Sequence, residues 1–224
     1  MVLDGATHFD GVDTGCIHDV PWLVGQLAAA LVEQLILGLE NLPEALAGAI
    51  EATCSAHAST CDLANPDSPS STVALVRSTG TAIEYLVLGD SPVILQTGDG
   101  ITPVVDDRVD HLQPGGRPYT RELVRSKRNA PGGFWVASTK PQAAHEAMWG
   151  IIDDVTHVAL LTDGVTRSVE YYGYNWTDIF ERLGRERPSE FIALVREAER
   201  NFPPPKYGYG KRHDDATAVY IQVT

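Results

Sequence analysis

Aspartate residues lie beside apolar, strand-like segments at four widely separated places in this sequence. They are found in Leu3-Asp4-Gly5, Gly89-Asp90-Ser91, Thr162-Asp163-Gly164 and His213-Asp214-Asp215. An unpaired carboxylate next to a buried strand is costly, and several carboxylates at one end of a sheet repel one another unless cations neutralise them. Hard oxygen ligands select Mg²⁺ or Mn²⁺. The pattern therefore favours an acidic metal site, although Asp-Gly alone is also a common turn dipeptide.

Hydrophobic periodicity divides the sequence into a helical first part and a mixed remainder. Apolar residues at helical spacing predict long helices over 21–39 and 43–63. Alternating apolar runs predict strands over 1–3, 71–78, 82–88, 92–96, 101–105, 155–162 and 216–223. Shorter helices are predicted over 119–128, 141–150, 176–183 and 189–202. Because no repeat or linker divides the chain, we expect one domain over residues 1–224.

The charge balance bears on the partners of the chain. Lys and Arg number 17 against 30 Asp and Glu, for a net charge of −13. Such an acidic surface repels phosphate backbones and anionic lipids, so we expect neither nucleic acid nor a membrane as a partner. The most apolar run, 27–39, is shorter than a bilayer span and contains Glu33 and Gln34, and no signal peptide opens the chain. We therefore expect a soluble, cytoplasmic protein of unknown oligomeric state.

The cysteines are odd in number and match no zinc-ribbon spacing. Cys16, Cys54 and Cys61 predict reduced thiols in a cytosolic compartment, with Cys54 and Cys61 on one helical face in the core. A polar cluster surrounds Cys16 in the loop after the first strand, and it comprises Asp13, Cys16, His18 and Asp19. A thiol or soft-metal site there is the alternative to a hydrogen-bonded loop, which we favour.

Taken in order, the strand-end motifs resemble those of the type 2C, metal-dependent serine/threonine protein phosphatases. Leu3-Asp4-Gly5 is similar to the family's Val-Phe-Asp-Gly element, and Gly89-Asp90-Ser91 to its Gly-Asp-Ser turn. Thr162-Asp163-Gly164 resembles its Ser-Asp-Gly element, and 214–219 its final Asp-Asn-x-Thr-x-Val strand. Ser71-Thr72-Val73-Ala74 resembles its Thr-Ala strand. The likeness extends over nearly the whole chain.

The resemblance implies an α+β fold, a four-layer αββα sandwich of two antiparallel sheets flanked by helix pairs. It also implies two Mn²⁺ or Mg²⁺ ions, and a third, weaker ion. Asp4 would bridge both main ions, the Gly5 carbonyl would bind one of them, and Asp163 and Asp214 would bind the other. Asp90 matches the position that binds the third ion together with Asp163.

The implied activity is hydrolysis of phosphoserine or phosphothreonine in a phosphorylated protein substrate. A metal-activated water would attack phosphorus, and Asp4, Asp163 and Asp214 would be the catalytic residues. Two alternatives stay open. One is a catalytically impaired relative that serves as a regulatory or phosphoprotein-binding module, and the other is a metal-dependent hydrolase of small phosphate esters on the same scaffold.

The sequence also departs from the family pattern. The family carries an earlier strand with an Arg that contacts phosphate and an Asn-Glu-Asp, and we expect this chain to lack that segment and bind metal more weakly. The His that follows Asp-Gly in the family is Ala6 here, and His8 is the nearest alternative general acid. Four basic residues of the stretch 121–128 would either receive a phosphopeptide or form a solvated helix face, which we favour; they are Arg121, Arg125, Lys127 and Arg128.

Overall fold

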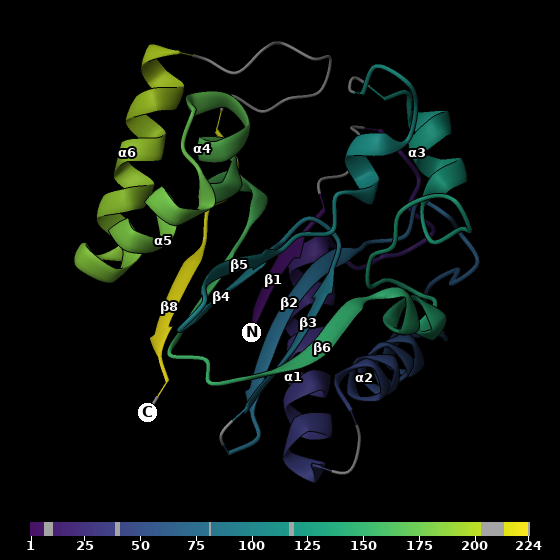
Figure 1. The fold of residues 1–224 in the computed structure, drawn as a ribbon. Helices are drawn as coiled ribbons and strands as arrows, with labels where there is room; N and C mark the ends of the chain where they lie inside the picture. Colours follow the sequence, from purple (N-terminus) through teal and green to yellow (C-terminus); the bar gives the residue numbers. More distant parts are fainter. Residues whose placement is uncertain (7–10, 39–40, 81, 117–118, 203–212, 224) are drawn as a thin grey trace.

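The computed structural model describes residues 1–6, 11–38, 41–80, 82–116, 119–202 and 213–223. Its strands form two antiparallel sheets of four strands each (Figure 1). The first sheet has the order β1-β2-β3-β6, with β1 (Val2–Gly5), β2 (Ser71–Ser78), β3 (Ala82–Leu88) and β6 (Met148–Asp153). The second has the order β5-β4-β7-β8, with β5 (Gly100–Val104), β4 (Val93–Thr97), β7 (His157–Leu161) and β8 (Ala218–Gln222).

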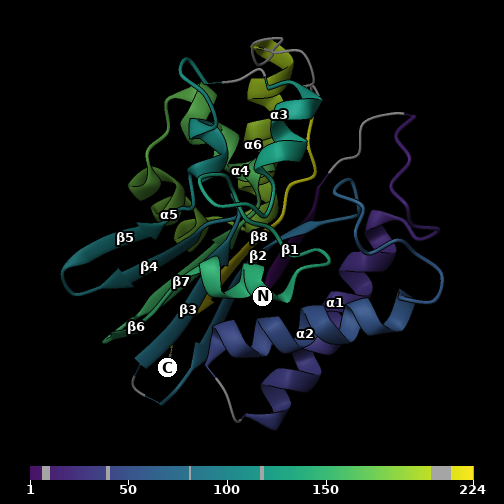
Figure 2. The same ribbon diagram turned by 90° about the vertical axis from the view of Figure 1, so that its right-hand side faces the viewer.

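Helices cover the outer face of each sheet, which confirms the predicted αββα layering (Figures 1 and 2). The first sheet is covered by α1 (Val20–Leu37) and α2 (Leu42–His57). The second carries three helices, α4 (Asp163–Tyr172), α5 (Trp176–Arg185) and α6 (Pro188–Asn201). The short helix α3 (Arg121–Lys127) lies beyond the strand ends, at the end of the sandwich where α4 and α6 also lie. Two 3₁₀ helices, η1 (Arg108–His111) and η2 (Pro141–Glu146), complete the described elements.

Each interface between layers has its own apolar core. Side chains alternate along a strand, so Val93 and Leu95 of β4 face the other sheet while Ile94 faces the helices. Strands buried on both faces read as continuous apolar runs, which is why β2 and β3 are so hydrophobic. On the outside of the first sheet, Leu27 and Leu46 pack in one cluster with Leu86.

Most predicted elements are confirmed, and three are corrected. The predicted helix over 43–63 ends at His57. The His57 carbonyl accepts hydrogen bonds from the Thr60 and Cys61 amides, which form turns after the helix. The predicted helix over 141–150 is a 3₁₀ helix followed by the edge strand β6, whose Trp149 and Ile151 are exposed. The sequence also predicted no helix directly after Asp163, whereas α4 covers Asp163–Tyr172 and is capped by Gly173 in a left-handed conformation (φ 74°).

The prediction of three reduced thiols is wrong. Cys16 and Cys61 form a disulfide across 45 positions, with Cα atoms 4.3 Å apart. The early end of α2 turns the chain back to the loop before α1, where the Asp62 amide donates to the Gly15 carbonyl at 2.7 Å. Cys54 is free and half-buried. The preferred reading of the surrounding cluster as a hydrogen-bonded loop is confirmed, because Asp19 caps α1 by accepting from the Trp22 amide at 2.9 Å.

Helix α1 is longer than the apolar run 27–39 that the sequence analysis judged too short to span a bilayer. Its 18 residues have a mean hydropathy of 1.6, so by length and composition the helix could cross a membrane. In this structure its buried residues, Leu23, Leu27 and Leu31, face α2 and the first sheet. The spacing of these leucines is that of an amphipathic helix covering a core.

Candidate active site

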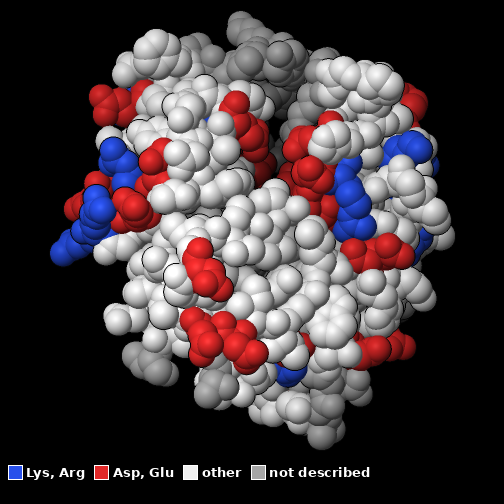
Figure 3. All heavy atoms as spheres, in the orientation of Figure 1, with Lys and Arg blue, Asp and Glu red and all other residues white. Residues whose placement is uncertain are grey.

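The predicted site residues line one cavity of about 300 Å³ at an end of the sandwich. Asp4, Gly5, Asp90, Asp163 and Asp214 all contribute to its wall, although they come from different elements. Figure 3 shows acidic atoms on both sides of a hollow in the upper half of the molecule, with basic atoms beside it on the side where α3 lies. The structure thus brings together all five predicted positions.

The first sheet positions Asp4 and Asp90. Asp4 lies on β1 opposite Thr72 of β2, and its carbonyl accepts a hydrogen bond from the Ser71 hydroxyl at 2.9 Å. Asp90 follows β3 in a turn that requires Gly89, whose φ is 80°. A Cβ atom at Gly89 would also lie 2.9 Å from the Thr72 side chain. The tight turn after β3 therefore depends on glycine at this position.

The second sheet positions Asp163 and Asp214. Asp163 is the first residue of α4, directly after β7, and Asp214 precedes β8, the strand that pairs with β7. The segments are held together by Thr162, whose hydroxyl accepts from the Thr217 amide at 2.9 Å. Gly164 permits this approach, since a Cβ atom there would lie 2.0 Å from the Asp215 carbonyl oxygen.

Burial and mutual repulsion perturb the two innermost carboxyl groups. Burial, the Asp163 charge, a hydrogen bond to Asp163 and the charges of Asp90 and Asp214 raise the pKa of Asp4 to about 8. Burial and the charge of Asp214 raise the pKa of Asp163 as well. Two carboxyl groups in contact inside a cavity do not both ionise readily, so the pair either retains a proton or binds a cation.

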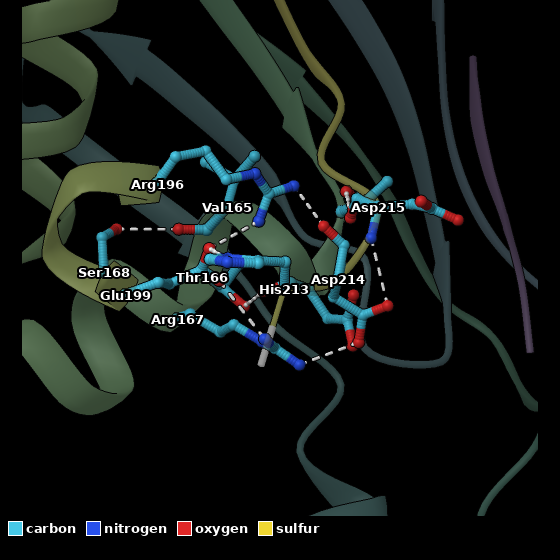
Figure 4. A network of polar contacts seen from close by, with 11 residues as sticks. Val165, Thr166, Arg167, Ser168, Arg196, Glu199, His213, Asp214 and Asp215 are labelled. Atoms are coloured by element: carbon cyan, nitrogen blue, oxygen red, sulfur yellow. Dashed lines mark hydrogen bonds and ion pairs between the residues drawn. The ribbon is translucent and has the colours of Figure 1, made fainter. Parts of the chain in front are cut away.

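Asp214 is held by a buried ionic network (Figure 4). The Arg167 guanidinium lies 2.9 Å from Asp214 Oδ2 and 3.3 Å from Oε1 of Glu199. Glu199 is fully buried on α6 and also contacts Arg196 at 2.8 Å and His213 at 2.7 Å. Burial raises the pKa of Glu199, but the hydrogen bonds from His213, Arg196 and Arg167 outweigh it, so its pKa is lowered.

Basic side chains also line the cavity, on the side where α3 lies. Arg121, Arg125 and Arg128 line it together with Asp67, whose carboxylate lies 2.8 Å from Arg121 and 3.5 Å from Arg125. The favoured reading as a solvated helix face is wrong for Arg128, which is half-buried and bonds to Ser70 and Pro66. Arg121 and Arg125 line the cavity and still keep 37% and 48% of their side chains exposed. Lys127 is half-buried, donates to the Gly132 carbonyl at 3.5 Å and is not among the described residues that line the cavity.

The sequence analysis did not single out two further residues of the site region, although each lies in a recognisable sequence pattern. Asp106 follows β5 as Asp90 follows β3; it is buried, lines the cavity and accepts from the Gly89 amide at 3.1 Å. Its position after an apolar run is the pattern that singled out the other aspartates. Glu199 is buried with Phe191 and Val195 on α6. A charged residue on the apolar face of an amphipathic helix is the pattern that could have indicated it.

Residues 1–195 match the sequence profile of the family described as protein phosphatase 2C. The chain belongs to the protein phosphatase 2C family. Membership supports a protein phosphatase activity and is consistent with the sandwich fold. A comparison with curated protein sequences finds no match.

Solved structures, two of them named as serine/threonine phosphatases, share the fold at low sequence identity. The catalytic domain of the serine/threonine phosphatase PstP in complex with two manganese ions is 17% identical with a TM-score of 0.51, over 89% of this chain and 79% of that one. Serine-threonine phosphatase 2C from Toxoplasma gondii is 15% identical with a TM-score of 0.50, over 97% and 82%. A C. elegans sex-determining protein is 14% identical with a TM-score of 0.55, and the match covers 97% of this chain but 54% of that protein.

The donor set of this phosphatase 2C cavity suits a divalent cation. Its carboxylates are hard oxygen ligands, and the raised pKa of Asp4 reflects its burial first and then the neighbouring negative charges, which a cation would neutralise. Among the described residues, however, no three His, Cys, Asp or Glu side chains are already arranged to hold an ion. Binding would require side-chain adjustment, including at Asp214, which is now paired with Arg167. Ala6 lines the cavity, and His8 lies outside the described residues.

Proposed function

We propose that this phosphatase 2C family member hydrolyses phosphoserine and phosphothreonine in proteins, with Mn²⁺ or Mg²⁺ as cofactor. The observation that carries the proposal is the meeting of Asp4, Asp90, Asp163 and Asp214 in a cavity that arginines also line. Carboxylates that bind cations, together with arginines in the same cavity, create a place for a phosphoryl group.

The residues that would hold two ions are Asp4, the Gly5 carbonyl, Asp163 and Asp214, with Asp90 available to a third. When bound, the ions would supply Lewis acidity and an activated water. Asp4 and Asp163 would lose the proton they retain without metal, since a cation favours both ionised forms. Arg167 would keep Asp214 oriented through its contact with the buried Glu199.

The proposed partner is a phosphorylated protein, and the net charge of −13 argues against nucleic acid. We propose that residues 1–224 act as one domain. Cytoplasmic location stays a prediction, and the Cys16–Cys61 disulfide weighs against it because disulfides persist mainly in oxidising compartments.

The test is phosphate release from a phosphothreonine peptide in Mn²⁺, in Mg²⁺ and in EDTA. We expect release only with a divalent ion, and we expect it to be lost in Asp163→Asn. The matched control is Asp99→Asn, which removes an exposed carboxylate from the turn between β4 and β5. Binding of the phosphopeptide without hydrolysis under any of these conditions would instead support the impaired, phosphoprotein-binding alternative.

A further inference from the structure

The basic wall of the cavity is built from α3 and the loop before β2. We propose that Arg121 and Arg125 form a binding subsite for the phosphomonoester dianion of the substrate, with Asp67 as the resident carboxylate that the dianion displaces from them. The inference rests on the proposed function in that it assigns part of the same cavity. It names the residues that would recognise the phosphoryl group through guanidinium groups.

Charge in this wall is unbalanced in a way that suits a dianion. Three guanidinium groups, those of Arg121, Arg125 and Arg128, share the wall with one carboxylate, that of Asp67. Arg128 bonds to uncharged groups, the Ser70 hydroxyl at 3.1 Å and the Pro66 carbonyl. The wall therefore has a formal excess of two positive charges, which equals the negative charge of a fully ionised phosphomonoester.

Arg121 also has an N–H donor that is not used by a hydrogen bond within the described part of the chain. Asp67 contacts Arg121 through Nη2 at 2.8 Å and Arg125 through Nε at 3.5 Å. Nε of Arg121 is buried and makes no hydrogen bond within the described part of the chain. Guanidinium groups bind phosphate through paired N–H donors, and those of Arg121 and Arg125 keep such donors available.

The scaffold fixes both arginines on the cavity side. Thr120 caps α3 by accepting from the Leu123 amide at 3.2 Å, and after the helix the Lys127 carbonyl accepts from the Phe134 amide at 3.1 Å. Tyr119, Phe134 and Val136 are buried and line the same cavity. An apolar lining weakens the competition from water, so that each charged contact to an anion counts for more.

The experiment measures the binding of inorganic phosphate to the full chain by calorimetry in excess Mg²⁺. Phosphate cannot be hydrolysed, so its binding is measurable whether or not the chain is active. We expect Arg121→Ala and Arg125→Ala each to weaken phosphate binding about tenfold, because hydrogen bonds to charged groups are the stronger ones. Lys127→Ala is the matched control, since it removes a cation from the same helix outside the cavity, and it should change binding less than twofold.

Asp67→Asn supplies a test of opposite sign. Removing the resident carboxylate should tighten phosphate binding about threefold, because the dianion then meets no competitor. Weaker binding in Asp67→Asn would overturn the role assigned to Asp67. Circular dichroism of every variant separates loss of the subsite from loss of the fold.

Two results would overturn the subsite itself: no phosphate binding to the wild type, or equal binding to the wild type and to both arginine variants. If the wild type nevertheless releases phosphate from the peptide, the proposed function stands without the subsite. Conversely, arginine-dependent phosphate binding by a chain that is inactive with every metal would support the subsite and contradict the phosphatase.

Discussion

The guanidinium of Arg167, on α4, lies 2.9 Å from the carboxylate of Asp214, on the segment that leads into β8. A proposed metal ligand thus already has a cation beside it. Arg167 is in turn fixed by Glu199, so the position of Asp214 depends on a fully buried residue of α6. A metal ion that binds here has to share Asp214 with Arg167 or displace it.

Glu199→Gln is expected to destabilise the fold. Glu199 contacts two arginines and a histidine, and removing its charge takes one buried carboxylate partner from each of them. We expect a loss of about 3 kcal/mol in the free energy of unfolding at pH 7, measured by urea titration. An unchanged urea midpoint would contradict the importance of the network.

The same variant has a defined pH dependence. The folded-state pKa of Glu199 is lowered from its ordinary value of 4.5, so its stabilising contribution is fully present above that pH. The contribution is lost as the pH falls through the lowered folded-state pKa. The difference in unfolding free energy between wild type and Glu199→Gln should therefore be constant near neutrality and shrink below about pH 4.5. A difference that grows in acid would contradict this assignment.

Asp163→Asn is expected to reduce the rate of metal-dependent phosphate release by about 100-fold or more, while the fold is retained. Burial and the charge of Asp214 raise the pKa of Asp163, so the uncharged amide relieves repulsion. The metal-free variant should therefore be as stable as wild type or more so. Thermal unfolding in EDTA measures this, and a clear fall in melting temperature would argue for a structural role.

Gly164→Ala is expected to move the Asp163 segment away from the Asp214 segment. The added Cβ would lie 2.0 Å from the Asp215 carbonyl oxygen, a backbone atom that moves only if the segment shifts. We expect a loss of about 2 kcal/mol in stability together with weaker Mn²⁺ binding by calorimetry. Gly98→Ala is the control, because nothing lies within 4 Å of a Cβ atom there. Equal effects at both positions would rule out the steric explanation.

Reduction of the Cys16–Cys61 disulfide is expected to cost about 3 kcal/mol of unfolding free energy, because the bond closes a long loop in the unfolded chain. Urea unfolding with and without reductant measures the loss. Cys54→Ser should keep the full effect of reductant, since its thiol is free. Insensitivity of the wild type to reductant would mean that the bond does not form in solution.

The sequence predicted strands β2 and β3 to the residue, since both are long, apolar and bounded by turn residues. It missed β6 because an edge strand with exposed Trp149 and Ile151 has no clear burial pattern. It missed α4 because Asp163-Gly164 reads locally as a turn, whereas Thr162 at the end of β7 serves as the N-cap.

The order of the motifs and their strand-end aspartates were determined by the sequence alone, because periodicity and turn chemistry are local properties of a chain. The basic wall was decided only by the tertiary structure. Whether an arginine on a short helix meets solvent or a cavity depends on what the fold places opposite it, here Asp67 beside Arg121. The same holds for Cys16 and Cys61, whose bond depends on where α2 ends. It also holds for Glu199, whose buried carboxylate is held by Arg167 of α4 and by His213 as well as by Arg196 of its own helix. Such long-range pairings are set by the packing of whole layers, and no local pattern encodes them.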